Sequence, residues 1–353
     1  MKLAFLIDKP QTVQMIAALL CLGYEKGYDI SVYATCGEKQ IQELKINVRW
    51  CHYTNRTALI KDFLQEKNKY DKIFGLNMFN DVWAELYQKN SENTYALEYC
   101  WNELYNCHRQ NFQSKTKLLT NTEWSRKQIY NNSTHKEIYF LGSPWYEFIK
   151  KFSISEEDKK PYVVFMAPHT SYFMQKTMGG FVEHVNKFLL ALNAFKQESK
   201  FDVILKTRQK YGDRMININF FDDVVSDINA FDHLKLYSEA RAVFHFCSSG
   251  VSELCLLRTP SFCIFPSYQN RLNYYDPEGA IKREINKRYY GGNIIDNTHC
   301  FSLDVDNYND LYRDTGYYLK QLQAPKNWQV FQDKFFSKGH DNASEKILQF
   351  IQK

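Results

Sequence analysis

The stretch from Leu236 to Pro266 constrains the fold of this chain more than any other. Its pattern predicts the end of a helix, a buried strand at 242–246, a polar turn, a helix at 251–258 and a second strand at 262–265. Short apolar runs of this kind are typical of strands that are covered on both faces. Strands that alternate with helices are typical of a parallel sheet. The stretch therefore predicts an α/β fold.

The polar turn at 248–250 is the first candidate site. Serines favour the N-terminus of a helix, and Gly250 lets a backbone approach closely. A helix that begins at the carboxyl end of a parallel strand offers unpaired N–H groups and a positive dipole end, which suit a phosphate. Ser248 and Ser249 can add hydroxyl donors, and Glu253 is placed to accept from a sugar hydroxyl. An ordinary capped helix would show the same pattern, so both interpretations stay open.

The same alternation of strands and helices extends through the rest of the 353 residues. A first series ends at Gly-Ser-Pro, residues 142–144, and a second begins near Tyr162. The charged, serine-containing segment at 150–160 is the expected linker. We expect two Rossmann-like, doubly wound domains, 1–150 and 151–330, that face each other across a cleft. Residues 331–353 are expected to form a helix that packs back on the first domain.

The net charge and the cysteine content indicate which partners and which cellular compartment to expect. The net charge of +5 is mild and its charges are interspersed, so a nucleic-acid partner is not expected. The charge is compatible with nucleotide diphosphates or with loose association with an anionic membrane surface. Nine cysteines, an odd number with no CxxC pair, fit a reduced cytoplasmic compartment. No signal peptide or apolar run of about 20 residues is visible, so a protein of the cytoplasm or the inner membrane face is expected.

Four segments, in this order, carry a family resemblance. They are IYFLGSPWY at 138–146, ILKTRQK at 204–210, FCSSGVSELCLLRTP at 246–260 and FFSKGHDNASEKI at 335–347. Together they resemble the GT-B fold glycosyltransferases and their relatives. Those relatives include the non-hydrolysing nucleotide-sugar 2-epimerases and the CDP-alcohol polymerases of teichoic acid synthesis. The resemblance implies a GT-B-like fold with an acceptor-binding first domain and a nucleotide-binding second domain.

The chain departs from these relatives at three places. Ile7-Asp8-Lys9-Pro10 stands where the epimerases have Gly-Thr-Arg-Pro-Glu, which counts against an epimerase. The Trp-His-Gly segment of the CDP-alcohol enzymes is missing, and YALEYCWNE at 95–103 occupies its place. Arg258-Thr259-Pro260 replaces the small-residue pair that usually precedes the proline.

The resemblance implies a donor site at the carboxyl edge of the second sheet. The residues it implies are Lys206, Arg208, Ser248, Ser249, Gly250 and Glu253. His169, in the loop after the strand at 162–166, and His245, in the strand before the serine turn, are further candidates from their positions, although an ordinary polar loop and a core histidine would show the same pattern. The serine turn would hold the donor diphosphate, Glu253 the ribose, and the two basic side chains would offset phosphate charge. Because those cations can stabilise the departing diphosphate, no metal is expected, and no cofactor besides the nucleotide-sugar substrate.

A transferase also needs a base that takes the proton of the acceptor hydroxyl. Glu98, in the expected fifth strand at 95–99, is the first candidate, because partial burial could raise the pKa of its carboxyl. Asp8, after the first strand, is the second, and Glu103 and His108 are further candidates. A paired core carboxylate is an equally good interpretation of Glu98.

These features favour a metal-independent glycosyltransferase. It would move a sugar from a nucleotide-sugar to a glycan, lipid-linked or protein acceptor, in bacterial surface polysaccharide synthesis. Two alternatives stay open. One is a CDP-alcohol phosphotransferase or a nucleotide-sugar epimerase on the same fold. The other is a non-catalytic GT-B-like binding protein.

Overall fold

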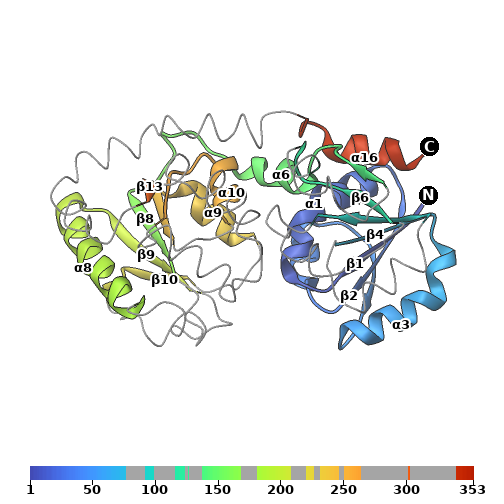
Figure 1. The fold of residues 1–353 in the computed structure, drawn as a ribbon, viewed down its shortest axis with the longest axis horizontal. Helices are drawn as coiled ribbons and strands as arrows, with labels where there is room; N and C mark the ends of the chain where they lie inside the picture. Colours follow the sequence, from blue (N-terminus) through green and yellow to red (C-terminus); the bar gives the residue numbers. More distant parts are fainter. Residues whose placement is uncertain are drawn as a thin grey trace, which may run out of the picture. The chain divides into compact units, whose positions relative to one another are not determined.

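A computed structural model describes residues 1–76, 92–98, 116–123, 126, 137–167, 181–207, 220–225, 231–245, 250–263, 301–302 and 339–353. The chain forms two compact units (Figure 1). The first unit holds Met1–Lys151, Asn229–Phe231 and Asp333–Lys353, and the second holds Phe152–Ile228 and Asp232–Gln332. Each unit is built on one parallel sheet.

The first unit contains a 7-stranded sheet in the order β3-β2-β1-β4-β5-β6-β7. Its strands are β1 (Lys2–Ile7), β2 (Asp29–Ala34), β3 (Arg49–His52), β4 (Lys72–Leu76), β5 (Thr94–Leu97), β6 (Lys117–Leu119) and β7 (Ile138–Tyr139). Its described helices are α1 (Pro10–Glu25), α2 (Glu38–Glu43), α3 (Arg56–Glu66), η1 (Lys67–Lys69), α6 (Pro144–Ile149) and α16 (Ala343–Ile351). The central strands are apolar runs buried on both faces, as a parallel sheet covered by helices requires.

The second unit contains a 6-stranded sheet in the order β10-β9-β8-β11-β12-β13. Its strands are β8 (Tyr162–Met166), β9 (Asp202–Lys206), β10 (Asp223–Val225), β11 (Ala242–His245), β12 (Ser261–Cys263) and β13 (Phe301–Ser302). Its described helices are α8 (Phe181–Ser199), α9 (Asp232–Glu239) and α10 (Val251–Leu256), while η4 (Lys150–Phe152) spans the boundary of the units. The prediction of an α/β fold with two Rossmann-like sheets is confirmed.

The two faces of the second sheet are covered by different helices, with α8 on one side and α9 and α10 on the other (Figure 1). On the first face, Phe188 of α8 packs on Phe165 and Phe244 with ring centroids 5.6 and 5.5 Å apart. On the other face, the Tyr162 hydroxyl donates to the Leu236 carbonyl of α9 at 2.9 Å. Because side chains alternate along a strand, this assigns each strand residue to one of the two faces.

The C-terminal helix α16 is fixed to the first unit by its own N-terminal turn. Glu147 of α6 accepts hydrogen bonds from the Ser344 backbone N–H at 2.9 Å and from the Ser344 hydroxyl at 2.7 Å. Next to this contact, Gly142 and Gly339 adopt φ angles of +94° and +89°. A Cβ atom on Gly142 would lie 2.5 Å from the Gly339 carbonyl oxygen. Two of the segments that carry the family resemblance therefore pack directly on each other.

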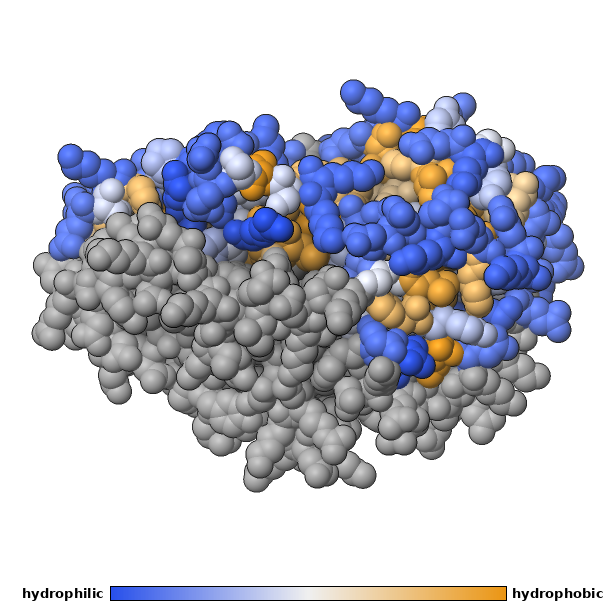
Figure 2. Space-filling model, turned by 90° about the horizontal axis from the view of Figure 1, so that it is seen from above, coloured by the Kyte–Doolittle hydropathy of each residue, from blue (hydrophilic) through white to orange (hydrophobic). Residues whose placement is uncertain are grey.

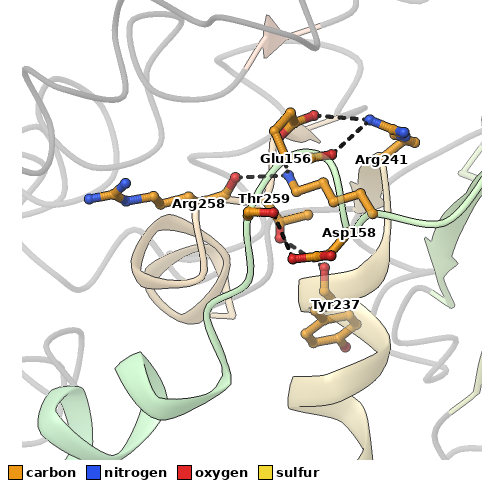
Figure 3. Close-up of polar contacts among 8 residues, drawn as sticks. Glu156, Asp158, Tyr237, Arg241, Arg258 and Thr259 are labelled. Atoms are coloured by element: carbon orange, nitrogen blue, oxygen red, sulfur yellow. Dashed lines mark hydrogen bonds and ion pairs between the residues drawn. The ribbon is translucent and has the colours of Figure 1, made fainter.

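The segment expected as a linker is in large part built into the second unit. The buried Lys159 ammonium donates to the Arg258 carbonyl at 3.1 Å and lies 3.0 Å from the Glu156 carboxylate. Arg241 donates to the Glu156 carbonyl at 3.2 Å (Figure 3). Burial lowers the pKa of Lys159. These contacts tie the chain before β8 to the turns before β11 and β12.

The described surface is mostly polar. Seen from above, it is largely hydrophilic, with small apolar patches among charged side chains (Figure 2). The exposed large apolar side chains of the described residues, Leu190, Val224 and Tyr24, belong to three different elements. None of the described helices is both long and apolar enough to cross a membrane.

A buried tyrosine predicts how stability depends on pH. The Tyr33 hydroxyl donates to Glu66 at 2.6 Å and lies 2.6 Å from the Tyr70 hydroxyl. Burial and the hydrogen bond with Glu66 raise the pKa of Tyr33 well above its ordinary value. The unfolded chain loses this proton near pH 10, whereas the folded chain retains it, so the free energy of unfolding should fall as pH rises above about 10. Urea unfolding between about pH 8 and 11 measures this slope.

Tyr33→Phe should make the alkaline loss of stability shallower, because the side chain that retains its proton is gone. The exposed Tyr24 supplies the matched control, and Tyr24→Phe should leave the slope unchanged. Equal slopes in the two variants would contradict the prediction.

Candidate functional site

Two of the predicted site residues flank the end of β8 in the second sheet. Met166 pairs with Lys206, and Phe165 pairs with Phe244, so His245 lies level with Met166 on the other side. The backbones of Lys206 and His245 are therefore about 10 Å apart, or two strand spacings. Lys206 is 6% exposed and His245 is 0% exposed. By alternation both side chains lie on the face that Tyr162 and α9 share.

This place is also where the strand order of the second sheet reverses. Strands β8, β9 and β10 run outward in one direction, and β11, β12 and β13 run outward in the other. In open parallel sheets, ligands bind outside the carboxyl ends of the strands at such a switch point. The switch point lies between β8 and β11. His245 ends β11, and Lys206 ends β9, the strand on the other side of β8.

Glu253 of α10 approaches the same face of the sheet together with a histidine that the sequence analysis missed. The Glu253 carboxylate lies 3.6 Å from Nε2 of His233, and the two side chains are 11% and 17% exposed. Both residues lie in the first turns of their helices. The pair becomes an ion pair when the imidazole is protonated. Carboxylate, imidazole and the Lys206 ammonium together supply groups that can bind sugar hydroxyls and phosphate oxygens.

The turn before α10 is described only at Gly250. Gly250 is the N-cap residue of α10 and has a φ of −62°, and no side-chain hydrogen bond from the described residues caps this end of the helix. Any residue can adopt this backbone conformation, so the structure gives no conformational reason for a glycine here. Four predicted site residues, Arg208, Ser248, Ser249 and His169, lie outside the described residues.

Glu98 is a paired core carboxylate in this structure. It follows β5, is 1% exposed, and accepts the Asn121 backbone N–H at 2.6 Å. The Asn121 side-chain amide donates back to the Glu98 carbonyl at 2.8 Å. The Asn121 amide oxygen accepts a hydrogen bond from the Ser143 hydroxyl at 2.7 Å, and Ser143 caps the N-terminus of α6. Glu98 thus connects the ends of β5 and β6 to α6, and its role as a base stays a prediction.

Asp8 has a cationic partner. Its side chain, 1% exposed, forms an ion pair with a guanidinium nitrogen of Arg56 at the start of α3. Burial raises the pKa of the neighbouring Cys36 thiol, and Asp8 adds to this effect. The further base candidates, Glu103 and His108, lie outside the described residues. Both first-sheet carboxylates therefore take part in contacts within the first unit.

No metal ligand set is formed by the residues that the structure describes. Among them, no group of three or more histidine, cysteine, aspartate or glutamate side chains is placed to hold a metal ion.

Comparison with known proteins identifies the fold. No protein-family model matches the chain, and no curated protein matches it. Among solved structures, the UDP-GlcNAc 2-epimerase of Neisseria meningitidis bound to UDP-GlcNAc matches 100% of this chain and 100% of its own at 12% identity, with a TM-score of 0.63. The UDP-GlcNAc 2-epimerase of Methanocaldococcus jannaschii matches 100% and 99% at 15% identity, with a TM-score of 0.61. MurG of Acinetobacter baumannii matches 100% and 99% at 10% identity, with a TM-score of 0.50.

The chain has a GT-B fold. Within it, Lys206 and His245 lie on one face of the second sheet on either side of β8. Glu253 belongs to α10, on the same side of the sheet as α9, where it meets His233. The first sheet of this GT-B chain holds Glu98 and Asp8 at the ends of β5 and β1, with β4 between these strands. Glu98 and Asp8 both have polar partners within the first unit.

Proposed function

We propose that the protein is a nucleotide-sugar enzyme that binds a UDP-sugar at the carboxyl edge of the second sheet and inverts the sugar at C2. The observation that carries the proposal is that Lys206 and His245 end strands on either side of β8, next to the switch point, and share one face of the sheet. The full-length likeness to UDP-GlcNAc 2-epimerases supports the choice of substrate and reaction. This choice departs from the transferase that the sequence favoured.

The proposed roles follow from charge and position. The Lys206 ammonium offsets the negative charge of the diphosphate, and burial strengthens this attraction because little water screens it. Glu253 accepts a hydrogen bond from a sugar hydroxyl, and the nearby His233 imidazole orients its carboxylate. His245 lies at the end of a strand where its imidazole can donate to a phosphate oxygen. The diphosphate is thus held by fixed charges rather than by mobile surface side chains.

A nucleotide-sugar-dependent glycosyltransferase is the second candidate. The observation that favours it is Asp8, which stands in the segment where the epimerases carry Gly-Thr-Arg-Pro-Glu and which pairs with Arg56. MurG and the glycosyltransferase of kitacinnamycin also cover the chain over its whole length. A glycan or lipid-linked acceptor, and a role in polysaccharide synthesis, belong to this candidate.

Incubation with UDP-GlcNAc in deuterated water, without an acceptor, separates the two candidates. Inversion at C2 removes and returns the proton on that carbon, so an epimerase should yield the C2 epimer with deuterium at C2, as read by proton NMR. A transferase should yield no epimer and should release UDP only when an acceptor is added. Binding without either product would favour a non-catalytic protein. Absence of UDP and UDP-GlcNAc binding in calorimetry would refute the epimerase, and absence of binding by GDP-, CMP- and CDP-linked sugars as well would refute the transferase.

A further inference from the structure

Helix α10 ends in a turn that favours glycine, but an arginine occupies it. The Arg258 backbone N–H donates to the Cys255 carbonyl at 3.1 Å, and the Thr259 backbone N–H donates to the Leu254 carbonyl at 2.9 Å. Together with the φ of +58° at Arg258, these hydrogen bonds form a Schellman motif, whose left-handed position is usually a glycine. Contacts from outside the helix must therefore help to hold the end of α10 in this conformation.

Two such contacts reach this turn, and one of them comes from a buried cation. The Lys159 ammonium donates to the Arg258 carbonyl at 3.1 Å, and the Lys159 side chain is 1% exposed. A cation is favourable there because the last carbonyl groups of a helix carry partial negative charge. The Thr259 hydroxyl donates to the Tyr237 carbonyl of α9 at 2.8 Å (Figure 3). The C-terminal ends of α9 and α10 are thus bound to each other, and α10 is bound to Lys159.

The Lys159 ammonium is itself held by the segment that precedes β8. It lies 3.0 Å from the Glu156 carboxylate. Arg241 donates to the Glu156 carbonyl at 3.2 Å and to the Glu156 carboxylate at 3.4 Å. The Lys160 backbone N–H donates to the Glu239 carbonyl at 2.8 Å. The ammonium therefore contacts the end of α10 from a segment that several hydrogen bonds keep in place.

The N-terminal ends of the same two helices carry Glu253 and His233. The Leu257 backbone N–H donates to the Glu253 carbonyl at 2.9 Å, so the Glu253 backbone lies one helical turn before the end of α10. The His233 ring meets the Tyr237 ring edge-on at 5.7 Å, and the Tyr237 carbonyl takes part in the contact between the two helix ends. A displacement of those ends would therefore reach both members of the pair.

We propose that Lys159 is a positioning residue that sets the arrangement of Glu253 and His233 through the carbonyl of Arg258. The inference deepens the proposed function and rests on it, because Glu253 is the carboxylate proposed to bind a sugar hydroxyl. Since its side chain is buried, Lys159 acts through the backbone of α10 rather than by contact with the ligand. Without the ammonium, the strained turn loses a partner and α10 should end in a different conformation.

Calorimetry with UDP tests the proposal in the full chain. Lys159→Met keeps much of the side-chain volume but removes the cation. It should weaken UDP binding about fivefold to tenfold, because Glu253 would lose its hydrogen bond to the ligand. Adding Arg258→Gly should restore the affinity to within about twofold of the wild type, since glycine adopts a positive φ without strain. Lys160→Met is the matched control from the next residue, whose side chain is 56% exposed, and should retain the wild-type affinity.

The proton NMR signals of the His233 ring test the same coupling without a ligand. The neighbouring Tyr237 ring makes their chemical shifts sensitive to position, and His233→Gln assigns them. They should move in Lys159→Met and return toward the wild-type values when Arg258→Gly is added.

The two measurements separate this proposal from the proposed function. If the wild-type protein does not bind UDP, the proposed function fails, and the His233 signals still decide whether Lys159 positions the pair. If the wild type binds UDP and Lys159→Met binds it equally tightly, the proposal is overturned. It is also overturned if the His233 signals stay unchanged in Lys159→Met, or if Arg258→Gly restores neither the affinity nor the signals.

Discussion

Gly142→Ala is expected to lower the free energy of unfolding by about 3 kcal/mol or more. The backbone of Gly142 has a φ of +94°, which an L side chain adopts only under strain. The added Cβ atom would lie 2.5 Å from the Gly339 carbonyl oxygen and 2.8 Å from the Ala343 Cβ atom. Backbone and helix would have to separate to make room, and α16 would lose its position on the first unit. Urea unfolding of the variant and the wild type measures the loss.

Gly27→Ala is the matched control for this effect. Gly27 also has a positive φ, +71°, but a Cβ atom there would meet nothing within 4 Å. Its cost should be the conformational strain alone, about 1 kcal/mol. The difference between the two variants isolates the contact between the turn at 142–144 and the start of α16. Equal losses in the two variants would show that this contact contributes little to stability.

Lys206→Met should weaken the binding of UDP by about 10- to 100-fold, and kcat/KM for the UDP-sugar by at least as much. The change keeps much of the side-chain volume of a residue that is 6% exposed, but removes the cation at the switch point. Calorimetry with UDP measures affinity, and steady-state rates with the UDP-sugar measure kcat/KM.

The exposed Lys235 of α9 provides the matched control in the same unit. Lys235→Met removes the same charge from the protein as a whole, and it should leave UDP binding within about twofold of the wild type. If Lys206→Met binds UDP as tightly as the wild type does, the diphosphate does not lie at this end of the second sheet.

The strands of both sheets could be predicted from sequence because they are short apolar runs. The strands predicted at 242–246 and 262–265 appear as Ala242–His245 and Ser261–Cys263. Helix α6 was missed, although Ser143 caps it and Pro144 occupies its first turn. Serine followed by proline is a recognised helix start, but Gly-Ser-Pro also fits a turn. The choice between them depends on Asn121 and Glu147, whose contacts with residues distant in the chain no local pattern displays.

Candidate residues at the ends of strands could be predicted from the sequence. Contacts between side chains that are distant in the chain could not. Lys206 and His245 follow from their positions at carboxyl ends of strands. His233 was missed because it lies in the first turn of α9, and its contact with Glu253, 20 residues away, shows in no local pattern. The role of Glu98 depends on Asn121, 23 residues away, so burial alone could not distinguish a base from a structural carboxylate.

One departure from the family pattern has a structural explanation. Arg258, which stands where the relatives have a small residue, adopts a φ of +58°. That conformation favours glycine, so Arg258 carries strain of about 1 kcal/mol. Its carbonyl accepts the hydrogen bond from Lys159, which holds this backbone in place. The small residue of the relatives thus fits the backbone conformation of the turn.

The first unit is built from three separate stretches of the chain, which limits how gene segments for such a protein can be exchanged. The polypeptide changes unit after Lys151, after Ile228, after Phe231 and after Gln332. Phe231 packs on Phe148 at 4.8 Å within the first unit, and α16 closes the same unit from the end of the chain. If a gene exchange replaced only the first 151 residues, the new sheet would have to pack against the original helix α16. Inheritance of a new first unit therefore requires three separate stretches of sequence to change together.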